Sequence, residues 1–565
     1  MTEAALPRTP QATTVPMRIA WLFGAVAFLL QVAFGGRYGY FRDELYYIAC
    51  SNHLAFGYVD MAPLTPWLTR ASHYLFGDSL HAIRLLPALG FAINVALTGY
   101  IARELGGKRW AMGMACVTVM LAPVILGNGT RLAMNSLEPC FWMGCVYALL
   151  LAINRQQPKL LLWCGVLLGF GLLNRHSTIF FLGALVAGLL LTPQRKLFTT
   201  KWFWVATAMA FFVCLPNVIW QYTHHFPTLS DLRNVKAMHK NIELPPLPFI
   251  KQQIMMLNPI TDLVWIAGLA FLLLHRSTKP FRFLGCTYLF FLGVMMALHG
   301  KDYYLAPIYS MLFAAGGVFW ETLSESRSRL RWVRVALPCV VVAVCLISIP
   351  LALPVLPPEK IAPYMRALGI ANTRTETTMT GMLPQHFADQ FGWEEMVASV
   401  ARVYTSDFPR FRELGVISAL QLLWAEASVD TIDIVKPYVD PEIYKWQYPA
   451  RSILDNGGVI SGASDWPVSS ANVFWGIYQA ITRKGPKGVL DTSQDMPREA
   501  MFYAYTRNSA RAMNMLDTIG SIAPGKRADL IAIDRDVLTA SPEQLREAKI
   551  LWTMVAGKTV YRAAK

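Results

Sequence analysis

Charged residues are scarce in this chain of 565 residues. Asp, Glu, Lys and Arg together make up 15% of the sequence, whereas 54% of it is hydrophobic. Soluble domains carry roughly 25% charged residues, so this composition excludes an ordinary soluble protein and indicates a polytopic membrane protein. The formal net charge is +15. Its basic residues are scattered among short links between apolar runs, which argues against a nucleic-acid-binding surface.

Residues that commonly bind metals are also few. The nine cysteines lie between Cys50 and Cys345 and include no Cys-x-x-Cys pair, which argues against a disulfide framework or a zinc ribbon. The ten histidines include no His-x-His pair, and none follows His386. His224 and His225 are adjacent but have no third ligand at metal-binding spacing, so we expect a loop pair. The sequence predicts no metal site.

The chain is rich in long apolar runs. A helix needs about 20 apolar residues to cross a bilayer. Eleven runs are long enough, or nearly so, and we expect a transmembrane helix in each: 19–36, 83–102, 110–127, 135–153, 159–173, 177–192, 202–220, 260–275, 283–299, 303–320 and 333–355. The first run lacks an Ala-x-Ala cleavage site, so we expect a signal anchor there.

Basic residues in the links predict the orientation of these runs. They gather in every second link, as Arg103, Lys108 and Arg109; Arg155 and Lys159; Arg195, Lys196 and Lys201; Arg276, Lys279 and Arg282; and Arg327, Arg329, Arg331 and Arg334. By the positive-inside rule these links and the N-terminus are cytoplasmic. The other links and the region after about residue 356 are then extracytoplasmic, and we expect a multi-pass protein of the cell inner (plasma) membrane.

The composition changes after Leu353, where Pro354, Pro357 and Pro358 end the last apolar run. We therefore expect a transmembrane domain over 1–355, the start of an extracytoplasmic tail over 356–406 and a soluble segment over 407–565. Gly165 and Gly169 have the spacing that lets two membrane helices approach closely, which is a weak signal in Gly-rich helices.

The links predicted to face outward carry ionisable and polar side chains near membrane depth, where such groups are costly and usually functional. The candidates are Arg42, Asp43, Glu44, Asp60, Arg131, Glu138, Arg175, His176, Lys301 and Tyr303. If these ends converge, cations could hold a phosphate leaving group while a carboxylate removes a proton from an acceptor hydroxyl. That combination suits sugar transfer from a phosphorylated lipid.

Structural roles are open for the same residues. Asp43 could be a first-turn carboxylate of a short interfacial helix that begins near Phe41. Arg131, Arg175 and Lys301 could each be an interfacial cation whose stem lies along apolar surface.

Three separated motifs resemble a known family. They are FRDELYY at 41–47, GYVDMAPL at 57–64 and GKDYYLAPIY at 300–309, and HFADQFGWEEM at 386–396 is similar to the opening of the family's tail. Together they resemble the dolichyl-phosphate-mannose-protein mannosyltransferase-like branch of glycosyltransferase family 39, over about residues 17–405. That branch includes relatives of the bacterial aminoarabinose transferases.

The resemblance implies a GT-C fold of about eleven transmembrane helices and a polyprenyl-phosphate sugar donor. It also implies inversion at the anomeric carbon, with a lipid, glycan or protein as acceptor. The family's presumed base falls on Asp43, with Glu44 beside it, and Glu138 lies about where relatives carry a second acidic residue. The resemblance names no certain cofactor and leaves the use of a divalent cation open.

The segment after residue 407 resembles a different family. GGVISGASDWPV at 457–468, YTRNSARA at 505–512 and GSIAPGKRADLIAID at 520–534 are similar to the closing part of amidohydrolase family 3. We expect a buried strand that leads to Asp465, where barrel enzymes keep catalytic groups, and an apolar strand after a Gly-rich turn. A complete barrel takes about 250 residues, so this segment is expected to be a truncated α/β fragment that cannot close.

The leading hypothesis is a membrane glycosyltransferase fused to this fragment. A metal hydrolase is disfavoured, because a metal-activated water needs several ligands and Asp465 has no histidine partners. A transporter or flippase for lipid-linked sugars also needs charge within the membrane but needs no base. A transferase inactivated by the fusion is the third alternative.

Overall fold

The computed structural model separates the chain into two compact units, the membrane unit Met1–Phe391 and the C-terminal unit Gly392–Lys565. It describes residues 18–77, 79–237, 242–370, 381–396, 407–436, 439, 441–466 and 468–563. Each unit is described by itself.

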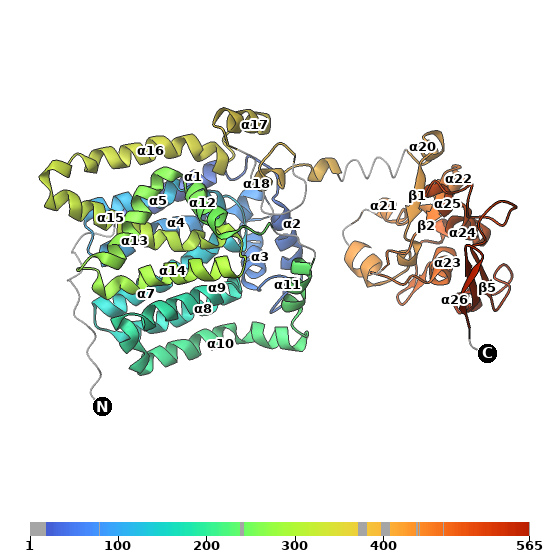
Figure 1. The fold of residues 1–565 in the computed structure, drawn as a ribbon, viewed down its shortest axis with the longest axis horizontal. Helices are drawn as coiled ribbons and strands as arrows, with labels where there is room; N and C mark the ends of the chain where they lie inside the picture. Colours follow the sequence, from blue (N-terminus) through green and yellow to red (C-terminus); the bar gives the residue numbers. More distant parts are fainter. Residues whose placement is uncertain are drawn as a thin grey trace. The chain divides into compact units, whose positions relative to one another are not determined.

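The described part of the membrane unit is helical throughout (Figure 1). Its α-helices are α1 Arg18–Phe34, α2 Arg42–Ser51, α3 Leu64–Phe76, α4 Leu80–Glu104, α5 Arg109–Leu121, α6 Pro123–Asn128, α7 Met134–Asn154, α8 Leu161–Asn174, α9 Thr178–Leu190, α10 Lys201–Thr223, α11 Pro227–Ala237, α12 Pro246–Leu257, α13 Asp262–Leu274, α14 Arg282–Ala297, α15 Tyr309–Ser326, α16 Val333–Ala352, α17 Pro358–Ala367 and α18 Gln385–Ala388. Short 3₁₀ segments join several of them, among them η3 Pro259–Thr261, η4 Lys279–Phe281, η5 Asp302–Ile308 and η6 Ser328–Leu330.

Two helices, α4 and α15, form the centre of this unit. α4 packs against α1, α5, α7 and α15, and α15 also packs against α5, α13 and α16. Every residue from Tyr309 to Val318 of α15 is buried. A helix that is apolar and buried on all sides belongs to the interior of a bundle, so α15 is a core helix.

The prediction of eleven spans was wrong. Each of the eleven apolar runs does contain a helix, but among the described residues only five helices are long and apolar enough to cross a membrane, or up to seven if each bent helix pair is one span. The five are Leu80–Glu104, Met134–Asn154, Lys201–Thr223, Lys279–Ala297 and Ser328–Ala352. The unit is a multi-pass helical membrane region with five to seven candidate spans.

Proline explains part of the difference. The run 110–127 is divided where α5 ends and Pro123 begins α6. The run 260–275 continues a longer helical segment that bends by 93° between α12 and the segment beginning at Pro259. Proline has no N–H for the helical hydrogen bond, so an apolar run that contains it need not form one straight helix.

Close packing of α8 and α10 uses the two glycines noted in the sequence. A Cβ at Gly165 would overlap the backbone carbonyl of Ala206, and one at Gly169 would crowd the side chain of Val213. Because a backbone atom cannot move aside as a side chain can, position 165 has no room for a larger residue.

The described part of the C-terminal unit is a small α/β body. Its helices are α20 Phe408–Glu413, α21 Pro441–Tyr444, α22 Ala450–Asp455, α23 Val473–Thr482, α24 Arg498–Tyr505, α25 Arg507–Ala512 and α26 Pro542–Arg546. Its strands are β1 Ile417–Leu420, β2 Val459–Gly462, β3 Lys484–Gly485, β4 Gly488–Val489, β5 Leu530–Ile533, β6 Ile550–Val555 and β7 Lys558–Arg562.

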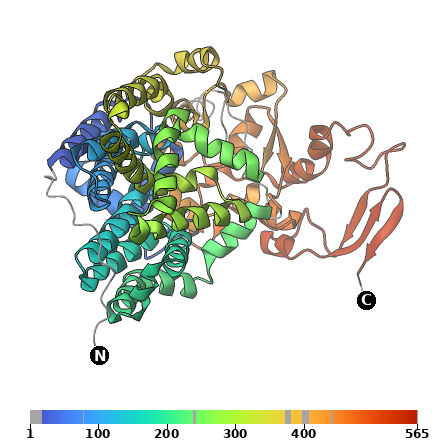
Figure 2. The ribbon, with the colours of Figure 1, turned by 60° about the vertical axis from the view of Figure 1, so that its left-hand side comes forward.

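Parallel pairing in the described part of this unit is limited to β1 and β2, which align Ile417 with Val459. α22, α24 and α25 pack on β2. The strands β5, β6 and β7 form an antiparallel sheet in that order, near the C-terminus in Figure 2. The expected strand before Asp465 and the expected apolar strand after the Gly-rich turn are therefore present, as β2 and β5.

We predict that Gly165→Ala lowers the free energy of unfolding of the purified protein in detergent by about 1–3 kcal/mol, because overpacking displaces α8 from α10. The matched control is Gly183→Ala in α9, where an added Cβ meets no atom within 4 Å. That control should be neutral or gain up to ~1 kcal/mol from helix propensity. Equal effects of the two variants would contradict the account of α8 and α10.

Candidate functional site

A buried ion pair between Glu44 and Arg84 joins α2 to α4. Glu44 Oε1 accepts hydrogen bonds from Arg84 Nε at 2.9 Å and from the Leu132 N–H at 2.8 Å. Glu44 Oε2 accepts from Arg84 Nη2 at 2.7 Å and from the Phe41 N–H at 2.8 Å. The Glu44 side chain is 0% exposed. Both its oxygens therefore have internal donors, and its geometry is that of a structural anchor.

The same arginine also holds the chain that leads into α2. Arg84 donates to the carbonyl of Gly35, and its Nη2 donates to the carbonyl of Gly39 at 2.8 Å. A Cβ at Gly39 would overlap the carbonyl of Gln390. This pair thus determines how the 35–41 segment enters the helix.

Asp43 differs from its neighbour Glu44. Its side chain is 40% exposed, and it accepts a hydrogen bond from Arg42 Nε at 3.3 Å. Burial raises the pKa of Tyr47 and of Tyr303, and the charge of Asp43 raises both further. A partly exposed carboxylate thus lies near one buried phenol, Tyr47, and one partly buried phenol, Tyr303.

A second ionic cluster lies where α7 begins and where α8 meets α9. Glu138 accepts from Arg175 Nη1 at 3.2 Å and from Ser177 Oγ at 2.9 Å. Arg175 also donates to Asn135 Oδ1 and lies 4.2 Å from the ring centroid of Tyr304. Glu138 is 2% exposed, so its charge is compensated inside the protein.

The two clusters lie near the same two phenols. The phenols of Tyr47 and Tyr303 are each affected by the charge of Asp43 and by that of Arg175. Residues from α2, from the link between α8 and α9, and from η5 therefore converge at one end of the bundle.

The remaining predicted residues lie around the same end. Tyr46 donates to Asp60 Oδ1 at 2.8 Å, and His176 Nε2 bonds Asn217 Oδ1 at 3.0 Å. Lys301 immediately precedes η5.

Arg131 lies over the ring of Phe41, 5.0 Å from its centroid. Burial, with the nearby Arg84, lowers the pKa of Arg131 to about 10, whereas the charges of Glu44, Asp43 and Asp389 act in the opposite direction. It therefore remains a cation at neutral pH.

The segment 385–391 packs against this end of the unit. The His386 carbonyl accepts from Arg131 Nη1 at 2.9 Å, and the Asp389 carbonyl accepts from the Arg42 N–H at 3.0 Å. The Asp389 carboxylate lies 3.7 Å from Arg42 Nη1. Burial lowers the pKa of His386 to about 3, so its neutral ring donates from Nε2 to the carbonyl of Leu351. This segment therefore supports Arg131 and also Arg42, the cation that pairs with Asp43.

A separate ionic group occupies the other end of α15. Glu321 accepts from the N–H groups of Lys108, at 2.6 Å, and Ala111, at 3.1 Å, where α5 begins. Glu325 pairs with Lys108 Nζ at 3.0 Å and with Arg334 Nη2 at 3.1 Å. These residues belong to the basic links predicted to be cytoplasmic. Tyr303, which is near Asp43, lies in η5 just before α15 begins, whereas Glu321 and Glu325 lie near the end of α15. The Asp43 group and the basic group therefore lie toward opposite ends of α15.

Reasoning from sequence missed Arg84, Asn135 and Ser177. A usable signal existed for Arg84, because it is a cation at the start of an apolar run and on the side opposite the basic links. Asn135 and Ser177 are uncharged and belong to no motif, so the sequence identified neither.

Within the described residues, no three His, Cys, Asp or Glu side chains are placed so that they could hold a metal ion. Asp465 follows β2 with a left-handed φ of 62°. The described part of the C-terminal unit therefore supplies no ligand set around it.

Two family models match the chain. Residues 60–220 match the dolichyl-phosphate-mannose-protein mannosyltransferase family, and residues 368–561 match the amidohydrolase family. Both resemblances recognised in the sequence are thereby confirmed. The amidohydrolase match begins before residue 407, so it includes the 385–391 segment that packs within the membrane unit.

This chain aligns with only part of the length of each relative. The lipid A galacturonosyltransferase RgtD of Rhizobium johnstonii is 25% identical over 198 residues, 35% of this chain and 41% of that protein. The N-substituted formamide deformylase of Arthrobacter pascens is 36% identical over 118 residues, 20% of this chain and 21% of that protein. The chain thus spans about two fifths and one fifth of these relatives.

Among solved structures, ArnT from Cupriavidus metallidurans bound to undecaprenyl phosphate is similar with a TM-score of 0.43 and 14% identity. The match covers 70% of this chain and 82% of that one.

We predict that Glu44→Gln destabilises the protein by about 3–5 kcal/mol, because it leaves the buried Arg84 charge without a counterion. Thermal unfolding in detergent measures the loss. The adjacent variant Asp43→Asn is the control and should unfold within about 0.5 kcal/mol of the wild type, since its side chain is partly exposed. A stable Glu44→Gln protein would show that the pair is dispensable for folding.

Proposed function

We propose that the membrane unit is an inverting glycosyltransferase that moves a sugar from a polyprenyl-phosphate donor to an acceptor hydroxyl outside the cytoplasm. The observation that carries the proposal is the partly exposed carboxylate of Asp43, which pairs with Arg42 at the end of the bundle where the predicted residues lie. The match of residues 60–220 to the mannosyltransferase family supports it.

Asp43 is the proposed base, because the other two candidate carboxylates are already engaged. Glu44 accepts four hydrogen bonds, and Glu138 is bound by Arg175 and Ser177. Asp43 removes the proton from the acceptor hydroxyl as that oxygen attacks the anomeric carbon from the face opposite the phosphate. The glycosidic bond forms, the bond to phosphate breaks with its electron pair, and polyprenyl phosphate leaves.

The cations have two proposed roles. Arg131 and Lys301 stabilise the charge on the departing phosphate, as preorganised cations do in phosphate sites. Arg42 orients Asp43 directly. Arg175 is held by Glu138, Asn135 and Tyr304, so we assign it to fixing the wall of the site next to the donor, with Asp60, His176 and Tyr303 as further lining groups.

The charges at the two ends of α15 support a proposed orientation in the membrane. Lys108 and Arg334, at the end opposite Asp43, belong to the basic links that the positive-inside rule places in the cytoplasm. The Asp43 end then faces outward, where the acceptor is a lipid, glycan or protein. We propose no hydrolase function for the C-terminal unit, because no histidine follows His386.

We predict that Asp43→Asn lowers the rate of polyprenyl phosphate release by about 10²–10⁴-fold, the usual contribution of a general base. Purified protein in liposomes is given a panel of polyprenyl-phosphate sugars, with membrane extract as acceptor. The matched control is Glu243→Gln, which changes an exposed carboxylate outside the site and should keep the wild-type rate.

Release that is equal in Asp43→Asn and wild type would reject Asp43 as the base. Movement of lipid-linked sugar across the bilayer without release of polyprenyl phosphate would favour a transporter. Neither activity in the wild type would favour an inactivated enzyme.

A further inference from the structure

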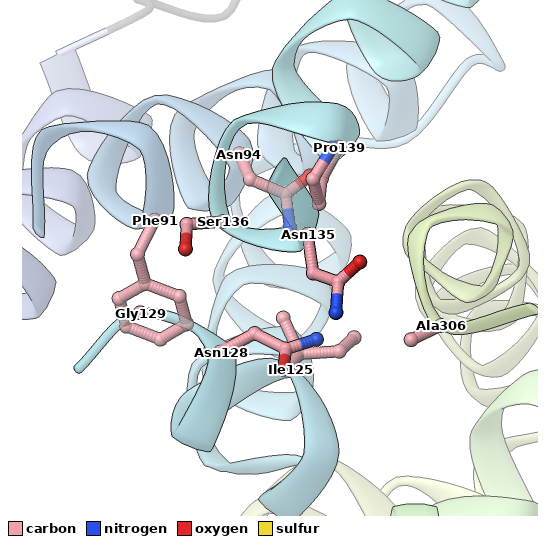
Figure 3. A pocket seen from close by; sticks show the side chains of 9 residues that line it. All are labelled: Phe91, Asn94, Ile125, Asn128, Gly129, Asn135, Ser136, Pro139 and Ala306. Atoms are coloured by element: carbon pink, nitrogen blue, oxygen red, sulfur yellow. The ribbon is translucent and has the colours of Figure 1, made fainter. Parts of the chain in front are cut away.

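The 3₁₀ segment η5 brings two aromatic residues to the candidate site. Its Tyr303 lies near Asp43, and Arg175 lies over the ring of its Tyr304. On the side of α6 and α7, Ala306 borders a small cavity of about 10 Å³ whose accessible lining is almost entirely apolar (Figure 3). A polar contact that fixes η5 therefore has to come from another side, and α12 is packed there.

One buried side chain of α12 ties the two ends of η5 together. Gln253 is 1% exposed, and its Nε2 donates at 3.2 Å to the carbonyl of Asp302, where η5 begins. Its Oε1 accepts at 3.0 Å from the hydroxyl of Tyr309, which follows η5 as the first residue of the core helix α15. Both partners lie in the motif at 300–309, whose closing tyrosine the proposed reaction does not use. Gln253 thus connects the start of η5 to the buried core.

Donors and acceptors determine the direction of this hydrogen-bonded chain. A backbone carbonyl only accepts, so the amide nitrogen of Gln253 faces Asp302 and its oxygen faces Tyr309. A phenol has one O–H group, and Tyr309 donates that group to Gln253. Tyr288 must then donate to the Tyr309 oxygen, which lies 3.2 Å away. Loss of the Tyr309 hydroxyl would leave a buried oxygen of Gln253 without its donor, which is costly.

We propose that Gln253 is a positioning residue for the transfer reaction, an inference that rests on the proposed function. Gln253 holds the carbonyl of Asp302, and the peptide bond joins that residue to Lys301, the proposed phosphate contact. The chain of Tyr288, Tyr309 and Gln253 therefore carries the fixed position of α15 to a cation of the site.

The turnover number tests this role against a matched control. Gln253→Leu should lower kcat for polyprenyl phosphate release by roughly 10–100-fold, because a small misplacement in a site costs that much. The control is Gln194→Leu in the link between α9 and α10. Gln194 is also a buried glutamine, and its Nε2 donates at 2.8 Å to the carbonyl of Pro280 in the 3₁₀ segment η4. Both variants should unfold at a lower temperature, but Gln194→Leu should keep the wild-type kcat. Equal kcat in the two variants overturns the proposal.

A double substitution shows whether the effect passes through Lys301. Lys301→Met alone should lower kcat. In that background Gln253→Leu should change kcat by less than about threefold, because the group that it positions is already gone. Fully additive losses, or a wild-type kcat in Lys301→Met, overturn the assignment.

Two smaller substitutions cover the case in which Gln253→Leu does not fold. Tyr309→Phe removes one oxygen atom, keeps the ring, and should lower kcat by roughly 2–10-fold, the equivalent of one hydrogen bond. Tyr288→Phe removes the donor farthest from η5 and should have the smaller effect. The reverse order, or a wild-type kcat in both variants, overturns the proposal.

Hydrogen exchange measured by mass spectrometry separates this proposal from the proposed function. In the purified full-length protein, backbone amides of 301–308 should exchange faster in Gln253→Leu than in the wild type, and Gln194→Leu should leave them unchanged. Unchanged exchange in Gln253→Leu overturns the positioning role whether or not sugar is transferred. A wild type that transfers no sugar rejects the proposed function, whereas faster exchange still shows that Gln253 holds η5.

Discussion

The buried pair of Glu44 and Arg84 is the interaction on which the candidate site depends. Removing two charges from water costs several kcal/mol per ion, and only excellent geometry with further hydrogen bonds offsets that cost. Here the pair gains the N–H groups of Phe41 and Leu132 and the carbonyls of Gly35 and Gly39. One contact between α2 and α4 therefore holds two chain segments, 35–41 and the link at Leu132.

This arrangement explains how two adjacent carboxylates take different roles. Consecutive residues of an α-helix point about 100° apart, so a short helix lying against the bundle directs one side chain inward and the next outward. Glu44 is the inward residue and Asp43 the outward one. The buried pair thus supports the position of Asp43, the proposed base, from the next residue.

Much of this was predictable from the sequence, and the failures have definite causes. Apolar runs predicted a helix in each position because hydrophobicity is a local property, but the number of spans was wrong because proline breaks and buried core helices depend on tertiary context. The convergence of Asp43, Arg131, Arg175 and Tyr303 was expected from their place on alternate links. Partners such as Arg84 and Ser177 lie far apart in sequence, and no local pattern identifies them.

The segment 385–391 bears on where the two family regions could have been joined. It lies inside the region that matches the amidohydrolase family, yet its carbonyls hold Arg42 and Arg131. A recombination that joined foreign sequence upstream of residue 385 would have removed these contacts, whereas one downstream of Phe391 keeps them. If the chain arose by fusion, selection for an intact site favours a crossover that keeps residues 385–391 in place.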